Sequence, residues 1–287
     1  MDSFYMVLPS NVDCKDYFPN NNLSNYTTKL PHRLHLGEGW EVGVAEISYT
    51  YSWLNVPTDK KIKFMCYNEH RKAVDTYEFV MSKGQYSTVE DLALELNNCF
   101  AKLKDALAYN TIVPKAVTKG QRIDVINGTD SNRRLIHVHL DDNLAGMLGI
   151  KNHKNKRLAD EYFNEVKNSK DSHPKITDEL KYQYGATYTD LMRGVYALYL
   201  YSDIIMPTFV GNTYSQIMRV VEIPSYAKHG QQVNIKYPTP FFYPVNQTEF
   251  ETIEIHVKDD TNKDIGFHFG RIIVTLHFRK KLISIRS

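Results

Sequence analysis

The sequence has few cysteines, no long apolar run and no recognisable export signal. Its three cysteines, Cys14, Cys66 and Cys99, are odd in number and far apart, so they form neither a disulfide framework nor a CxxC metal motif. No stretch approaches the ~20 apolar residues of a membrane helix. The N-terminus lacks the basic start and apolar stretch of a signal peptide. We expect no membrane span and synthesis in the reducing cytoplasm or nucleus, without secretion.

A large excess of one charge sign is also missing. The 287 residues include 35 Lys and Arg against 33 Asp and Glu, a net charge of +2. Dedicated nucleic-acid-binding proteins usually carry a larger basic excess. The composition therefore excludes strong global attraction to phosphate and leaves only local basic patches open.

Motifs of enzymes and cofactor-binding proteins are absent. The sequence contains no GxGxxG, P-loop, HExxH or GxSxG. The carboxylate pairs Asp141-Asp142 and Asp259-Asp260 lie in turn-like sequence and are interpreted as solvated turn residues. We therefore predict no catalytic residues and no cofactor, and a protein that is not an enzyme.

One pattern, His137-Val138-His139, is typical of a metal-binding strand. Residues two apart on a strand share a face, so both imidazoles could reach one metal ion, as in cupins. A cupin also needs a carboxylate and a later histidine at set distances from glycines. Here Asp141 and Asp142 follow too closely, Gly128 lies too far upstream, and His256, His268 and His277 lack the accompanying glycine and proline pattern. We predict no metal site.

Aromatic and alternating residues dominate what is present. Twenty Tyr and thirteen Phe favour the half-buried surface of a β-sheet. The segments Thr252–Val257 and Ile272–Arg279 alternate in polarity, as strands with one buried face do. About a dozen such short strands are separated by turn signals. This pattern predicts an all-β fold, a single jelly roll of two packed antiparallel sheets.

Two segments depart from the β pattern. Apolar residues three or four apart predict an amphipathic helix near 88–108 that packs on the sheet, with Ser87 and Glu90 as its capping box. Residues 151–194 are polar and charge-dense, with a helix expected near Leu158–Val166. Too few apolar residues remain there for a core of its own, so we interpret 151–194 as an insertion in one domain, 1–287.

Several segments together resemble one family, the minor capsid (penton) proteins of Polinton/Maverick elements and adintovirus-like viruses. They span nearly the whole chain in order. The segments are Ser3–Asn11, Tyr17–Asn21, Asn25–Pro31, Gly39–Ile47, Leu198–Ile205, Val210–Thr213 and Gly266–Arg279.

The resemblance implies an icosahedral virion protein. It implies a single jelly roll that forms homopentamers at the five-fold vertices, beside a double-jelly-roll major capsid protein, without catalytic residues. A major capsid protein normally needs two eight-stranded sandwiches, for which 287 residues is short, so the minor role is expected. The charge-dense stretch 151–194 is where the family pattern maps least.

A small basic cluster follows the last predicted strand: Arg279, Lys280, Lys281 and Arg286. The simple interpretation is a solvated strand end. The functional alternative is nonspecific contact with the phosphates of packaged DNA.

Two other functions stay open. One is a nonenzymatic, lectin-like jelly roll for attachment, although such modules are commonly secreted and the signal and disulfides are missing. The other is a cupin-type metalloenzyme that would use His137 and His139.

Overall fold

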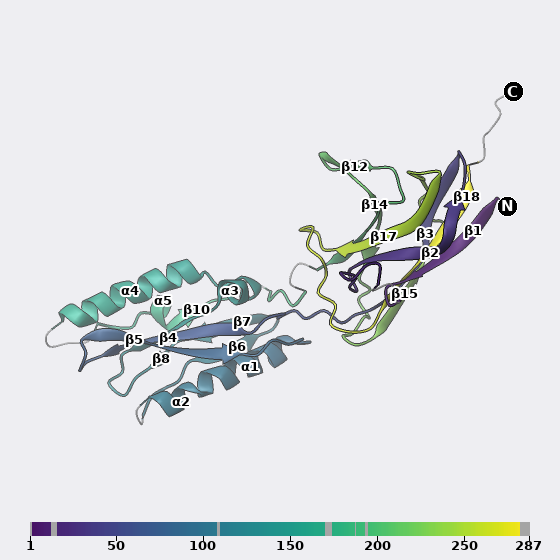
Figure 1. Cartoon of the computed structure of the whole chain (residues 1–287). Helices are drawn as coiled ribbons and strands as arrows, with labels where there is room; N and C mark the ends of the chain where they lie inside the picture. The colour runs from purple at the N-terminus through teal and green to yellow at the C-terminus, as the bar shows by residue number, and fades with distance from the viewer. Residues whose placement is uncertain are drawn as a thin grey trace. The chain divides into compact units, whose positions relative to one another are not determined.

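The computed structural model describes residues 2–12, 16–107, 110–169, 174–186, 188–192 and 195–281. The chain is mostly β, with some helices and several antiparallel sheets (Figure 1). It forms two compact units: unit 1 is Met1–Trp53 with Gly194–Ser287, and unit 2 is Leu54–Arg193. This organisation differs from the single all-β domain expected for 1–287.

Unit 1 contains two larger sheets, which we call sheet A and sheet B. The strand order of sheet A is β1 (Ser3–Pro9), β18 (Ile272–Lys280), β3 (Trp40–Thr50) and β15 (Gln232–Lys236), with the short β16 (Tyr243–Pro244) also paired to β3. The order of sheet B is β14 (Ile217–Glu222), β11 (Ala197–Ser202), β17 (Glu249–Lys258) and β2 (Asn25–His35). A hairpin, β12 (Thr208–Val210) with β13 (Thr213–Ser215), lies between β11 and β14 in the chain. All of these pairs are antiparallel.

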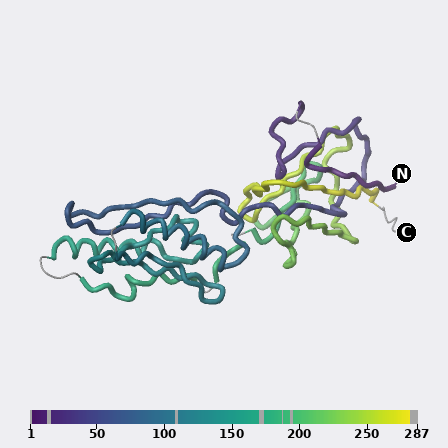
Figure 2. Tube along the Cα trace, turned by 90° about the horizontal axis from the view of Figure 1, so that it is seen from below, coloured from purple at the N-terminus to yellow at the C-terminus, as the bar shows by residue number. Residues whose placement is uncertain are grey.

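One core joins the two sheets of unit 1. Alternate residues of β18, such as Val274, Leu276 and Phe278, are buried with residues of every long strand in both sheets, as the period-two alternation predicts. The Tyr26 hydroxyl on β2 donates to the Leu8 carbonyl on β1 at 2.9 Å, which ties the two sheets at one side. Figure 2 shows the first and last strands, β1 and β18, side by side.

Unit 2 has a four-stranded and a three-stranded sheet. The first has the order β5 (Ala73–Met81), β4 (Lys60–Asn68), β9 (Leu135–His139) and β8 (Gly128–Thr129). The second has the order β10 (Tyr182–Gln183), β7 (Arg122–Ile126) and β6 (Lys115–Lys119). The helices are α1 (Val89–Ala101), α2 (Leu103–Ala106), α3 (Asp142–Leu148), α4 (Asn152–Asn168) and α5 (Asp178–Lys181).

The helices of unit 2 cover both faces of the strands (Figure 1). Phe64 on β4 meets Phe100 of α1, with ring centroids 5.6 Å apart. Tyr67, three positions along β4 and so on its other face, is buried with Tyr162 and Phe163 of α4. The charge-dense stretch is thus no isolated insertion, because the apolar residues of α4 form a core together with Tyr67 of β4 and Leu135 of β9.

The N-cap of the expected helix near 88–108 lies one residue later than predicted. Thr88, not Ser87, is the N-cap: its hydroxyl accepts from the Asp91 amide at 3.0 Å, and Asp91 accepts from the Thr88 amide at 3.1 Å. Val89, Leu92, Leu96 and Phe100 are buried. A break at Lys102 separates α1 from the short α2.

Within the described residues, no helix combines the length and apolar character needed to cross a membrane.

Candidate assembly and binding surfaces

A groove opens where the two sheets of unit 1 end in their edge strands β14 and β15. Its volume is about 490 Å³, and its walls include Arg219, Glu222, Tyr226, Lys236 and Tyr237. We call it the Arg219 groove. Because β14 and β15 end sheets B and A respectively, the groove marks an unpaired side of the sandwich.

Arg219 is held in this groove by aromatic rings. Its guanidinium carbon lies 3.9 Å from the ring centroid of Tyr237 and 4.3 Å from that of Phe241. Its Nη1 is buried and has no hydrogen-bond partner, and Arg219 forms no ion pair within the described residues. Cation–π contacts contribute roughly 0.5–2 kcal/mol each, yet a buried N–H without an acceptor is costly. The aromatic rings therefore hold the guanidinium in place, and no carboxylate of the described residues neutralises its charge.

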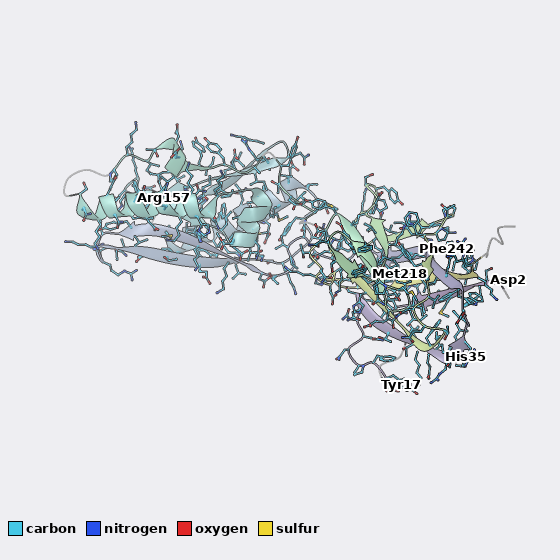
Figure 3. The ribbon with its side chains drawn as sticks, turned by 90° about the horizontal axis from the view of Figure 1, so that it is seen from above. Asp2, Tyr17, His35, Arg157, Met218 and Phe242 are labelled. Atoms are coloured by element: carbon cyan, nitrogen blue, oxygen red, sulfur yellow. The ribbon has the colours of Figure 1, made fainter. Side chains whose placement is uncertain are left out.

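In the basic cluster, for which contact with DNA is the functional alternative to a solvated strand end, Arg279 already has a partner. Its Nε and Nη2 donate to Glu41 at 3.2 and 3.1 Å, and its guanidinium lies 3.5 Å from the ring centroid of Phe242. Lys280 and Lys281 are exposed at the end of β18, where Figure 3 shows Asp2 and Phe242 at the same end of unit 1. Arg286 lies outside the described residues.

The two histidines of the metal-like pattern sit on β9 in different surroundings. His137 is buried, and burial lowers its pKa to about 3. Its Nδ1 lies 3.3 Å from Asn127 Nδ2, while its Nε2 has no partner. The pKa of the less buried His139 is also lowered, mainly by burial. No group of three or more metal-ligating side chains occurs in the part of the chain that the structure describes.

Asn127 and Gln183 complete a buried amide network around His137. Asn127 Oδ1 accepts from the Val138 amide at 2.9 Å and from Gln183 Nε2 at 2.8 Å. Gln183 Nε2 also donates to the Val138 carbonyl at 2.7 Å. The network joins β9 to β10, so its role is structural. Nothing in the sequence pattern around Asn127 predicts this role, because its partner Gln183 is 56 residues away.

A second pocket, of about 440 Å³, lies in unit 2 between the start of α4 and the β10 segment. Tyr182 and Tyr184 line it with stacked rings whose centroids are 5.8 Å apart. Lys151 and Lys154 line it as well, and Lys154 pairs with Glu179 at 3.5 Å. Farther along α4, Arg157 pairs with Glu161 at 3.7 Å (Figure 3).

The described cysteines behave as small apolar side chains. Cys66 and Cys99 are buried free thiols, and burial raises the pKa of each to about 11. Neither is therefore a reactive thiolate near neutral pH. Cys14 lies outside the described residues.

Comparisons with known proteins find similarity in structure. No protein-family model matches the chain, and no curated protein sequence is similar to it. Twenty-two solved chains are similar in structure. One is the selenomethionine-labelled mavirus penton protein, aligned over 96% of this chain and 98% of that chain, with 10% identity and a TM-score of 0.47. A likeness of this strength carries no argument about function.

The sequence analysis missed Arg219, which is the functional candidate that the structure adds. Its neighbours Tyr237 and Phe241 are 18 and 22 positions away, after another strand. The available signal was weak: an uncharged stretch from Ile204 to Met218 that ends at a single arginine.

Proposed function

We propose that this chain is a structural virion protein, the minor capsid or penton subunit of an icosahedral capsid. In this proposal unit 1 is a single jelly roll that forms homopentamers at the five-fold vertices, beside a double-jelly-roll major capsid protein. The protein has no enzymatic activity, and its place is the capsid vertex after synthesis in the host cytoplasm or nucleus.

The strand order of unit 1 supports the jelly roll. Numbered along the chain, its eight long strands form sheets of order 1-8-3-6 and 5-4-7-2. Each sheet thus alternates strands from the two ends of the unit, and all neighbours are antiparallel. Eight strands wound into two facing sheets with Greek-key connections describe a jelly roll, an architecture common in viral capsids.

The observation that carries the proposal is where the family-like segments lie. All of them belong to unit 1, and they include most of β1, β3, β11 and β18 and the start of β2. Not one comes from Leu54–Arg193. The residues that resemble penton proteins are thus the ones that build the sandwich, which is the part that a vertex subunit needs.

Mass photometry with negative-stain microscopy tests the proposal on the purified full chain, alone and mixed with the major capsid protein. The expected particle is five times the 33.3 kDa chain, with five-fold class averages. A chain that stays monomeric in both preparations would overturn the proposal.

A lectin-like attachment module is the second candidate, and the Tyr182 and Tyr184 pocket is what favours it. Stacked, partly exposed aromatic rings beside lysines offer an apolar face and cationic groups to one ligand. Glycan-array binding by a protein that forms no pentamer would favour this reading over the capsid one.

A further inference from the structure

The Arg219 groove carries two positive charges and one negative charge. Arg219, Glu222 and Lys236 all line it. Glu222 and Lys236 are exposed, while Arg219 is partly buried against Tyr237 and Phe241. Arg219 has no ion-pair partner among the described residues, and aromatic rings against its guanidinium leave the plane of that group for a carboxylate, which takes N–H donors in this plane.

The turn between β17 and β18 carries the opposite set, two negative charges and one positive charge. Asp260, Lys263 and Asp264 are all exposed on it. Asp259 shapes this turn from within, because its Oδ1 accepts from the amides of Thr261 and Lys263 at 2.8 and 2.9 Å. The turn is therefore ordered by its own hydrogen bonds, and its other charged side chains are left for outside contacts.

The groove and the turn lie near the same end of the strands of the sandwich. Arg219 pairs across from Leu200, and Leu200 pairs across from Val257, one residue before the end of β17. The turn from Asp259 to Asp264 follows immediately. Along the strand direction, then, the two charged surfaces are only a few residues apart.

They lie on different sides of unit 1. The groove is on the side of the edge strands β14 and β15. The turn joins β17 to β18, which are the neighbours of the other two edge strands, β2 and β1. Two different, complementary surfaces on different sides, near the same end of the strands, are what a head-to-tail contact between identical subunits requires if it is to close into a ring.

We propose that the Arg219 groove binds the β17–β18 turn of a second copy of this chain. Arg219 and Lys236 pair with Asp260 and Asp264 of the neighbour, and Glu222 pairs with the neighbour's Lys263. This contact rests on the proposed function, because it specifies which surfaces join the subunits of the ring. Arginine and tyrosine at such a contact agree with the residue types that dominate association energies.

Charge-reversal variants of the full chain test the contact by mass photometry over a concentration series. Arg219→Glu is expected to weaken association by about tenfold or more, and so is Asp260→Lys with Asp264→Lys. Combining Arg219→Glu with Asp260→Arg should recover most of the loss. Arg33→Glu is the matched control, because Arg33 lies on the outer face of β2 near Glu249 and Glu251, and its reversal should leave the assembly unchanged.

The outcomes separate the two proposals. If the wild-type chain forms pentamers and both reversals leave them intact, the contact is overturned and the proposed function stands. If the wild-type chain forms no ring with or without the major capsid protein, the proposed function fails and the contact fails with it. Circular dichroism of each variant shows that a loss of association is not a loss of folding, and the turn variants are exposed substitutions that avoid the core.

Discussion

Arg219 and Arg279 show how similar side chains differ in what they can still bind. Both guanidinium groups lie over aromatic rings. Arg279 also has a carboxylate partner, Glu41, whereas Arg219 has no ion-pair partner among the described residues and a buried Nη1 without an acceptor. We therefore assign Arg279 to holding the end of sheet A and Arg219 to contact with another molecule.

The engagement of Arg279 leaves Lys280, Lys281 and Arg286 as the residues of the DNA-contact hypothesis, and Lys280 and Lys281 are the two that the structure describes as exposed. Reversing both to glutamate should leave the assembly of empty shells intact and reduce genome retention, because phosphate contacts are nonspecific and additive in charge. The measurement is the DNA content of purified particles. Arg33→Glu serves as a control for charge reversal elsewhere on unit 1, and equal packaging by the Lys280 and Lys281 variant would reject the hypothesis.

His137 gives unit 2 a specific dependence on pH. Its pKa is about 3 in the folded protein against about 6.5 when unfolded, so between these values the unfolded state binds more protons. The free energy of unfolding of unit 2 therefore has its full value above about pH 6.5 and decreases as the pH drops toward 3. We expect unit 2 to lose about 2 kcal/mol between pH 7 and pH 5.

Hydrogen exchange measured on peptides from β9 reports this loss directly, after correction for the intrinsic rate. His137→Gln places a side-chain amide near Asn127 and removes the titrating imidazole, so the stability of β9 in this variant should vary little over the same pH range. His139→Gln, at the less buried site, should retain most of the wild-type dependence. A wild-type profile flat from pH 7 to 5 would contradict the assignment.

At the scale of elements, α1 shows why a helix start is hard to place from sequence. Both Ser87 with Glu90 and Thr88 with Asp91 have the spacing of a capping box, and the pattern alone does not choose between them. The structure uses Thr88 with Asp91, and Val89 is the first helical residue.

Thr88→Ala should destabilise α1 by about 1 kcal/mol, because the Asp91 amide loses its acceptor. Ser87→Ala is the matched control and should change stability by less than about 0.5 kcal/mol. Amide exchange in the first turn of α1 distinguishes the two. An equal effect of both substitutions would show that the cap is shared.

The strands of unit 1 were more predictable than the organisation of unit 2. The alternation of Ile272, Val274, Leu276 and Phe278 marks one buried face without further information, and all four are buried. The polar composition of 151–194 indicated an insertion without a core. In the structure, four residues of α4 are buried in one core with residues of the strands: Ala159, Tyr162, Phe163 and Val166. Their partners, including Tyr67 and Leu135, come from strands far earlier in the chain, and that pairing cannot be read from local periodicity.

At the scale of the whole molecule, unit 2 is inserted between two strands of the sandwich. The chain leaves unit 1 after β3, which ends at Thr50, and re-enters it before β11, which starts at Ala197. Unit 2 has its own sheets and its own cores, and the sandwich core consists of unit 1 residues alone. We infer that the sandwich does not depend on unit 2 for its folding.

Replacing residues 54–193 by a short Gly-Ser linker should therefore leave unit 1 folded and able to form the same ring. Both tryptophans, Trp40 and Trp53, lie in unit 1, so tryptophan fluorescence follows its unfolding in the shortened and the full chain. Similar unfolding midpoints and pentameric mass are expected. A shortened chain that cannot fold would show that unit 2 stabilises the sandwich.

The central claim is that this chain occupies capsid vertices. Electron cryomicroscopy of particles assembled from this chain and the double-jelly-roll major capsid protein tests it most directly. The account predicts five copies of the unit 1 sandwich around each five-fold axis, with the Arg219 groove of each copy against the β17–β18 turn of the next. Closed particles whose five-fold positions are filled by the major capsid protein alone would contradict it.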